Sequence, residues 1–221
     1  MLPRASMERE QPVVAAFDFD GTLSTRDNVV PFLHRVAGLR TTLGAVGASA
    51  LYVVTRARAQ PIRDGLKTDV VRRVFAGRDA GLVGDIADEF AADIVRRHLR
   101  ADAVARAQWH REQGHRVVIV SASFGVYLRP VAQQLGLDAV LATELEVGSD
   151  GRLTGRLTGA NVRGAEKARR LDQWIEDWRT ETPDARPVFV WAYGNDGGDR
   201  ELWTRADRAV RIGRRASLKP A

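Results

Sequence analysis

The stretch "VVAAFDFDGTLSTRD", residues 13–27, places two aspartates directly after a run of apolar residues. Residues 13–17 predict a buried strand, and Asp18 and Asp20 follow at its end. A carboxylate removed from water is costly unless a cation or hydrogen-bond donors meet it. Side chains alternate along an extended chain, so Asp18 and Asp20 lie on the same side of it. The stretch therefore predicts a paired carboxylate site at the end of the first strand.

The rest of the sequence shows two kinds of pattern. Between residues 25 and 100, apolar residues recur at helical spacing and are divided by Gly or Pro. After residue 100, helical and strand patterns alternate. Helices are expected at 101–113, 124–135 and 164–178 and near Asp199, strands at 116–121, 139–143, 187–193 and 208–212, and a hairpin at 144–159. Short apolar strands between helices are typical of a parallel sheet covered on both faces.

We therefore predict an α/β fold, a Rossmann-like parallel sheet with a helical cap inserted after the first strand. Residues 13–24 and 101–221 are expected to form the core domain, residues 25–100 the cap domain, and residues 1–12 a flexible tail. Ligands of such sheets bind outside the carboxyl ends of the strands. Polar residues follow those predicted ends: Ser121, Ser123, Asn195, Asp196 and Asp199, with Lys167 opening a helix between the two strands.

Composition narrows the classes of function. The 221 residues carry a formal charge of +6 and no cysteine, which excludes disulfides and thiolate metal sites. The N-terminal residues lack a signal-peptide pattern, and the longest apolar stretch, 43–54, is shorter than the about 20 residues of a membrane span. We expect a cytoplasmic protein. No helix-turn-helix or zinc pattern accompanies the positive charge, so no nucleic-acid partner is expected.

Four segments together resemble the motifs of the haloacid dehalogenase superfamily, in the order of that family. They are "DFDGT" at 18–22, "VVIVSAS" at 117–123, "RGAEKARRL" at 163–171 and "YGNDGGDREL" at 193–202. The helical insert resembles the cap of subfamily IB, the phosphoserine phosphatase-like branch, and the segment 96–146 resembles a group that includes phosphatidylglycerophosphate phosphatases. The resemblance implies a phosphatase that works through an aspartyl-phosphate.

Elementary phosphoryl-transfer chemistry agrees with these roles. Asp18 can attack phosphorus as a nucleophile, and Asp20 can protonate the leaving oxygen and then deprotonate water. Donors to the phosphate oxygens are expected from five residues: the main-chain N–H groups of Gly21 and Thr22, the Ser121 hydroxyl, the Ala122 N–H and the Lys167 ammonium. These groups would neutralise the charge that develops on the phosphoryl oxygens.

The resemblance implies Mg²⁺ as cofactor, held by the Asp18 carboxylate, the Asp20 carbonyl and Asn195, with Asp199 in the outer part of the metal site. All of these offer the oxygen ligands that Mg²⁺ prefers. The fourth motif usually begins Gly-Asp, whereas Asn195 follows Gly194 here. This change predicts weaker Mg²⁺ affinity, unless Asp196 takes the ligand position. Asp196 is equally well suited to cap the following helix.

The substrate is less well defined by the sequence. Asp27 can contact a substrate amino group, as the resemblance implies, or cap the following helix. Arg63 and Lys67 in the cap are further candidate specificity residues, and the apolar stretch 43–54 beside basic residues suits at most a peripheral membrane contact. We predict a Mg²⁺-dependent phosphomonoester hydrolase for a small or amphiphilic ester, such as a phosphoserine-like, histidinol phosphate-like or phosphatidylglycerophosphate-like compound. The alternatives are phosphotransfer to another acceptor and a non-catalytic protein that binds an anionic lipid or nucleic acid. The sequence does not indicate the oligomeric state.

Overall fold

The computed structural model describes residues 11–38, 62–181 and 186–213, together with single positions between 41 and 47. The side chains of residues 62–64 and 66 lie outside this description, as do residues 1–10 and most of 39–61, where the tail and the apolar stretch were predicted. Within the described segments, no helix combines the length and apolarity needed to cross a bilayer.

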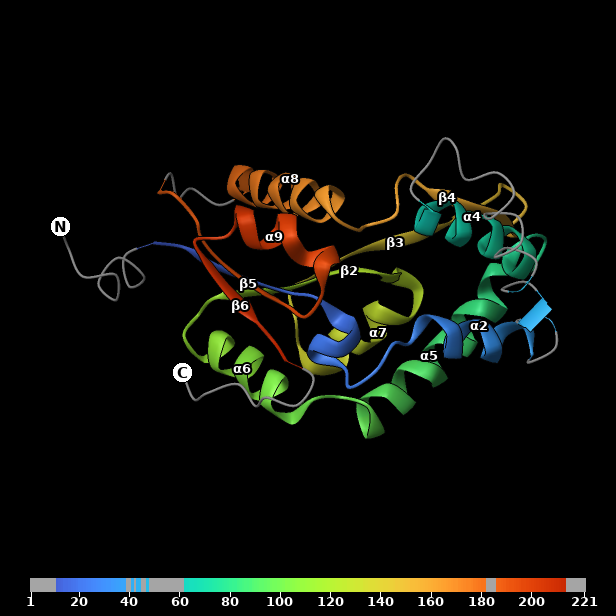
Figure 1. Cartoon of the computed structure of the whole chain (residues 1–221), viewed down its shortest axis with the longest axis horizontal. Helices are drawn as coiled ribbons and strands as arrows, with labels where there is room; N and C mark the ends of the chain where they lie inside the picture. Colours follow the sequence, from blue (N-terminus) through green and yellow to red (C-terminus); the bar gives the residue numbers. More distant parts are fainter. Residues whose placement is uncertain are drawn as a thin grey trace.

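A six-stranded sheet in the order β4-β3-β2-β1-β5-β6 lies at the centre of the described chain (Figure 1). Its strands are β1 (Val13–Phe17), β2 (Arg116–Phe124), β3 (Ala139–Val147), β4 (Leu153–Thr158), β5 (Phe189–Gly194) and β6 (Arg208–Arg211). All neighbours are parallel except β3 and β4, which form the predicted antiparallel hairpin. The predicted α/β fold with a largely parallel sheet is confirmed.

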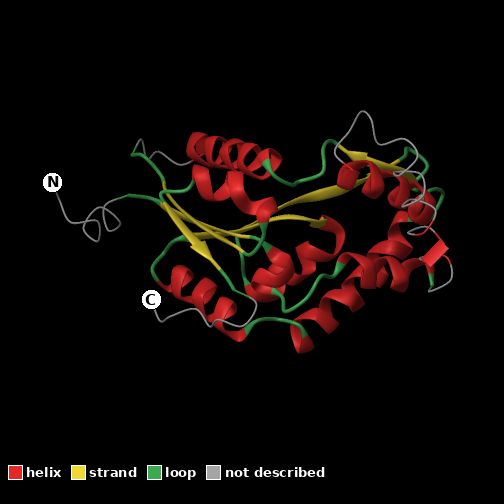
Figure 2. Cartoon of the chain, viewed as in Figure 1, coloured by secondary structure: helices red, strands yellow, loops and turns green. Residues whose placement is uncertain are grey.

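Helices cover both faces of the sheet (Figures 1 and 2). On one face lie α8 (Ala165–Glu181) and α9 (Arg200–Arg205), whose Leu171 and Leu202 pack with the buried side chains of Val14 and Val118. On the other face lie α6 (Ala101–Glu112) and α7 (Gly125–Leu135). Because alternate residues of a strand point to opposite faces, two apolar layers form from the central strands β1, β2 and β5, which are buried along most of their length.

The segment of residues 25–100 is helical, as predicted, and its described helices include α2 (Val29–Ala37), α4 (Ile62–Phe75) and α5 (Ala80–Arg97). Its aromatic side chains pack on the end of β2 and on α7: the ring of Phe32 lies 4.8 Å and that of Phe90 5.4 Å from Tyr127, and Phe75 lies 5.5 Å from Phe124. These helices therefore share the apolar layer of one sheet face.

The chain enters and leaves this helical segment through two adjacent stretches of backbone. Ser24 and Leu99 form an isolated antiparallel bridge, and the N–H of Arg100 donates to the carbonyl of Leu23 at 2.9 Å. In Figure 1 this helical segment lies beyond one end of the sheet, the end at which β1 leads into the following turn. The helices are thus placed over the carboxyl ends of the strands. The division into core and cap domains at residues 24 and 100 stays a prediction.

Candidate active site

An open pocket of about 1310 Å³ lies where the carboxyl ends of β1, β2 and β5 face α2 and α4. The predicted site residues that line it are Asp18, Asp20, Gly21, Asp27, Lys67, Ser121, Ala122, Lys167 and Asn195. Thr22 and Asp199 are buried beneath this surface and contact the lining residues. The topology therefore gathers residues from four distant motifs into one pocket.

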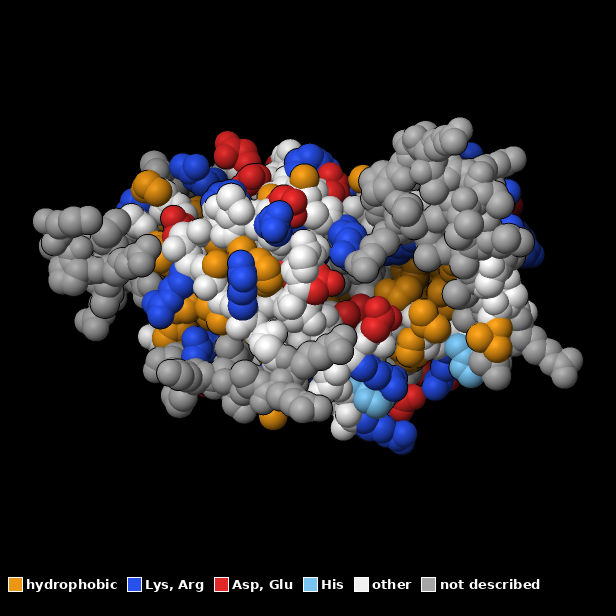
Figure 3. All heavy atoms as spheres, viewed as in Figure 1, with side chains coloured by type: hydrophobic (Ala, Val, Ile, Leu, Met, Phe, Trp, Pro, Cys, Tyr) orange, Lys and Arg blue, Asp and Glu red, His pale blue; other side chains and the backbone are white. Residues whose placement is uncertain are grey.

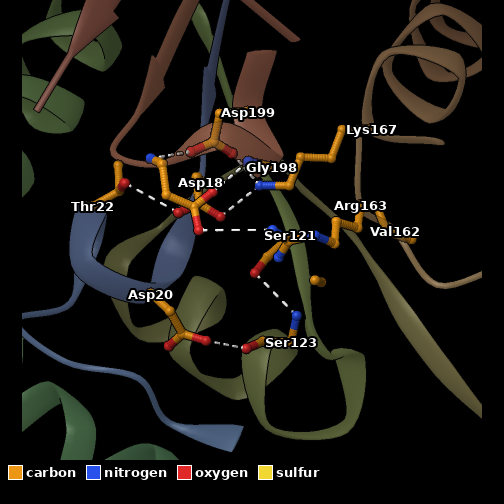
Figure 4. Close-up of polar contacts among 12 residues, drawn as sticks. Asp18, Asp20, Thr22, Ser121, Ser123, Val162, Arg163, Lys167, Gly198 and Asp199 are labelled. Carbon is orange, nitrogen blue, oxygen red and sulfur yellow. Dashed lines mark hydrogen bonds and ion pairs between the residues drawn. The ribbon is translucent and has the colours of Figure 1, made fainter. Parts of the chain in front are cut away.

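Asp18 is held by three neighbours at the end of β1 (Figure 4). Its N–H donates to the carbonyl of Tyr193 on β5 at 2.9 Å, and the Tyr193 ring stacks on Phe17 with centroids 4.2 Å apart. Its carboxylate accepts from Lys167 Nζ at 2.6 Å through one oxygen and from Thr22 Oγ1 at 3.1 Å through the other. The nucleophile predicted from the sequence is therefore fixed in position by both its main chain and its side chain.

Lys167 lies between two buried carboxylates. Its Nζ donates to Asp18 and, at 2.5 Å, to Asp199 Oδ1, and all three side chains are buried. Burial by itself lowers the pKa of Lys167, but the two carboxylates outweigh it and the pKa is raised above its ordinary value. Burial also raises the pKa of Asp18, which Lys167 opposes. Asp18 thus depends on nearby positive charge to stay ionised.

Asp20 is held from the opposite side of the pocket (Figure 4). One carboxylate oxygen accepts from the Asn28 main-chain N–H at 3.0 Å and from the Asn28 side-chain amide at 2.7 Å, and the other accepts from the Ser123 hydroxyl. Burial raises the pKa of Asp20 to about 7, although the donors from Ser123 and Asn28 oppose the rise. A carboxyl group with this pKa can give up and take back a proton near neutral pH.

We expect activity on alkyl phosphates to fall above about pH 7, because the Asp20 pKa is raised to about 7 and its deprotonated form cannot protonate a leaving alkoxide. The basic limb of kcat/KM against pH should fall about tenfold per unit. In Asp20→Asn this limb should disappear, with kcat/KM lowered by about 10²- to 10⁴-fold. The measurement is the pH profile of both proteins from about pH 5 to 9, the range that brackets this pKa. A basic limb that persists in Asp20→Asn would assign the proton to another group.

The turn after Asp18 brings its backbone close to the fourth motif. Gly21 has φ +78° and lies against the side chain of Asn195, so that a Cβ here would collide with the Asn195 amide. Glycine is required for both reasons. Ser121 and Ala122 line the pocket from the end of β2, and the Ser121 hydroxyl accepts from the Ser123 N–H at 3.1 Å. Thr22 was predicted to offer its N–H to phosphate, and its hydroxyl also orients Asp18.

The oxygen atoms near Asp18 are suited to hold a magnesium ion as a mixed set of carboxylate, carbonyl and carboxamide ligands. In the described part of the chain no three His, Cys, Asp or Glu side chains gather as a metal site, so a cation here requires carbonyl and carboxamide oxygens as well. Asp18, the Asp20 carbonyl and the Asn195 side chain supply such oxygens, and burial of Asp18 creates the need for positive charge.

Asp196 and Asp199 are engaged elsewhere. Asp196 Oδ1 accepts from the Gly198 N–H at 2.5 Å and caps the short helix of residues 197–199, while Asp199 Oδ2 accepts from the N–H groups of Asn195 at 2.9 Å and Asp196 at 3.2 Å. The geometry therefore favours Asn195 over Asp196 as a ligand. Asp199 is placed to orient Lys167 and the backbone of Asn195.

The candidate specificity residues differ in position. Asp27 lines the pocket and its carboxylate accepts from the Val29 N–H at 2.9 Å, so it caps α2 while it faces the site. Lys67 reaches from α4 to the Ala122 carbonyl and to Asn161 Oδ1 at 2.8 Å, and lies 4.7 Å from the centre of the Phe124 ring. Arg63 belongs to α4, but its side chain lies outside the described residues.

Two further polar residues emerge only from the structure. Asn28 is fully buried and holds Asp20, although its sequence position indicates a helix cap. Asn161 lines the pocket and lies 2.9 Å from Thr143 Oγ1, which ties the loop before α8 to β3. Neither of these two contacts has a signal in the sequence, because each joins residues that only the tertiary fold brings together.

A family model described as "haloacid dehalogenase-like hydrolase" matches residues 15–203, which include all four motifs. The chain belongs to this family. Protein CicA of Caulobacter vibrioides is 36% identical over 200 residues, covering 89% of this chain and 84% of CicA. The phosphoserine phosphatase of Archaeoglobus fulgidus is 29% identical and covers 99% of this chain, which spans 57% of that enzyme's length. A crystal structure of a protein of unknown function from Bordetella pertussis Tohama I has the same fold, with TM-score 0.73, 21% identity and coverage of 91% and 90%.

Proposed function

We propose that the protein is a Mg²⁺-dependent phosphomonoester hydrolase that forms an aspartyl-phosphate on Asp18. The observation that carries this proposal is the buried Asp18 carboxylate, bound by Lys167 at 2.6 Å, beside an Asp20 whose pKa lies at about 7. A nucleophile held by a cation and an acid of neutral pKa are the two groups that phosphate ester cleavage requires. The resemblance to phosphoserine phosphatases supports the same reaction.

In the first step an oxygen of Asp18 attacks phosphorus and the bond from phosphorus to the ester oxygen breaks. Asp20 gives its proton to that departing oxygen, which leaves as the neutral alcohol. Lys167, Ser121 and Gly21 line the pocket where the phosphoryl oxygens would lie, and their donors would stabilise the charge of those oxygens. The products of this step are the alcohol and the acyl phosphate on Asp18.

In the second step water attacks the phosphorus of the acyl phosphate, and Asp20 takes up the proton that the water loses. The phosphorus–oxygen bond to Asp18 breaks, inorganic phosphate leaves, and both aspartates return to their starting forms. The Asn28 and Ser123 donors fix Asp20, so the same carboxyl group serves both steps. Mg²⁺, held by Asp18, the Asp20 carbonyl and Asn195, would reduce repulsion between the carboxylate and the phosphate.

The substrate is proposed to be a small or amphiphilic phosphate monoester. Relatives named phosphoserine phosphatase and histidinol-phosphatase favour small esters, the latter from Neisseria meningitidis matching 42% of this chain. Asp27 at the pocket and the cations Lys67 and Arg163 give such esters polar partners. Transfer of the phosphoryl group to an acceptor other than water, and binding without turnover, are alternatives that the following experiment distinguishes.

We expect phosphate release to require added Mg²⁺ and to stop with EDTA. Asp18 and Asn195 together contribute only one negative charge to the metal ligands, so Mg²⁺ should bind weakly and dissociate readily. The assay uses phosphoserine, histidinol phosphate, phosphatidylglycerophosphate and methyl phosphate. Asn195→Asp adds a second ligand charge and should lower the Mg²⁺ concentration for half-maximal rate by about tenfold. Release that EDTA leaves intact would exclude the proposed cofactor, and alcohol release without phosphate release would indicate transfer. Metal-stimulated binding without any release would indicate a non-catalytic protein.

A further inference from the structure

One wall of the active-site pocket is apolar. Val29, Val30 and Leu33 of α2 and Val70 and Val71 of α4 all line the same pocket as Asp18 and Lys167. Leu33, Val70 and Val71 are nearly fully buried, whereas Val30 is 52% exposed. Figure 3 shows hydrophobic side chains next to acidic ones on this face, over α2. The pocket therefore has a charged end at the sheet and an apolar wall on the helices.

The size of the pocket also exceeds the need of a small polar ester. Its volume of about 1310 Å³ lies above the about 300–1,000 Å³ typical of small-molecule sites. A phosphate and a short polar substituent would occupy only the charged end, near Ser121, Lys167 and Asn195. The half-exposed Val30 and the partly buried Val29 of α2 would then stay in contact with water. An exposed apolar surface beside a buried reactive group indicates a ligand that covers it.

We infer that the leaving group of the substrate carries an apolar chain, which packs chiefly on Val29 and Val30 of α2, on the wall that Leu33, Val70 and Val71 complete. The inference rests on the proposed phosphatase function and narrows its substrate class to amphiphilic phosphate monoesters. The phosphate lies at Asp18, and the chain extends along the wall towards the half-exposed Val30. Burial of the chain supplies the binding free energy, and the charged end supplies the chemistry.

The test is the dependence of kcat/KM on chain length for n-alkyl phosphates from methyl to about decyl, below the concentrations at which they form micelles. The leaving alcohols beyond the shortest have nearly equal acidity, so only the apolar area changes along the series. Each added methylene should raise kcat/KM by about twofold to fourfold until the wall is covered. If kcat/KM stayed the same from methyl to decyl phosphate, the inference would be overturned.

Two matched variants separate the wall from general surface effects. Val30→Asn should reduce the slope of log kcat/KM against chain length by about half or more, because it places a polar group on the apolar wall. Leu82→Asn introduces the same side chain near the start of α5, where Leu82 is 65% exposed and does not line the pocket, and should leave the dependence unchanged. Equal slopes in Val30→Asn and Leu82→Asn would contradict the proposed wall.

Failure of the proposed function would look different. If the natural chain released no phosphate from methyl phosphate or from any longer ester, the proposed phosphatase function itself would be wrong. If all esters were hydrolysed in an Asp18-dependent way at the same kcat/KM, only the substrate class would be wrong. If the melting temperatures of Val30→Asn and Leu82→Asn differ from that of the natural chain only as much as ordinary surface substitutions cause, the fold is intact.

Discussion

Asp18→Asn is expected to reduce kcat for every phosphate ester by about 10⁴-fold or more, because it removes the atom that attacks phosphorus. The carboxamide keeps the size of the side chain and one oxygen, but its oxygen is a far weaker nucleophile. The carboxamide oxygen can still accept from Lys167 Nζ while its NH2 group donates to Thr22 Oγ1, so the pocket should keep its shape. Phosphate release is the measurement, at saturating ester and Mg²⁺.

Asp196→Asn is the matched control for this substitution. Asp196 follows β5 at the same edge of the sheet, but it is exposed and its carboxylate caps the helix of residues 197–199. Asparagine is an equally good cap, so this variant should retain most of the activity. A second measurement is the mass of the wild-type protein after acid quench during turnover, which should show one added phosphoryl group that is absent in Asp18→Asn. Turnover by Asp18→Asn near the wild-type rate would exclude the covalent mechanism.

The sequence predicted most of the fold because the central strands β1, β2 and β5 carry nearly continuous apolar runs, whereas the edge strand β6 is largely exposed. Residues 13–17 form β1 as predicted, and the predicted strand at 116–121 extends to Phe124, where the Ser121 and Ser123 hydroxyls follow the buried run. The predicted strand at 139–143 and the first arm of the predicted hairpin at 144–159 form one continuous strand, β3, which pairs with β4. Strand ends depend on pairing partners, which periodicity along the chain does not contain.

The candidate site was predictable in its residues but not in its contacts. The positions of Asp18, Ser121, Lys167 and Asn195 at strand and helix ends follow from the parallel order of the sheet. That Asn28 holds Asp20 was not predictable, since a polar residue before an apolar helix favours a cap on local grounds alone. The apolar wall of α2 and α4 likewise depends on how the two helices meet over the sheet. Local patterns thus identify the reacting groups, and the tertiary fold decides which groups position them.

Lys167→Met is expected to have the second largest effect, with loss of both activity and stability. Without the ammonium, Asp18 and Asp199 remain buried with no cation between them, and the Asp199 charge raises the pKa of Asp18 with nothing to oppose it. Removing one partner of a buried ion pair costs about 3–5 kcal/mol in the free energy of unfolding. We expect kcat to fall by about 10³-fold, since the transferring phosphoryl group loses the buried ammonium that compensates its charge.

The pH dependence of this loss has a definite sign. In Lys167→Met the folded-state pKa of Asp18 lies above its unfolded value, because burial and the Asp199 charge raise it and no ammonium opposes them, so unfolding releases a proton at intermediate pH. The variant should therefore approach wild-type stability below about pH 4, where the Asp18 carboxyl group is protonated, and lose stability as the pH rises through the folded-state pKa of Asp18. Urea unfolding of both proteins at several pH values, in EDTA, measures the difference in free energy of unfolding.

The double variant Lys167→Met/Asp199→Asn separates the structural role of Lys167 from its catalytic one. The Asp199→Asn change removes one of the two unpaired carboxylates. The new carboxamide oxygen can still accept from the N–H of Asn195, which Asp199 accepts at 2.9 Å in the present structure. About half or more of the lost stability should return, because one buried charge is less costly than two. Activity should stay low, since no ammonium faces the phosphate. If activity returned together with stability, Lys167 would act only by holding the fold, and the charge that compensates the phosphoryl group would have to come from elsewhere in the pocket.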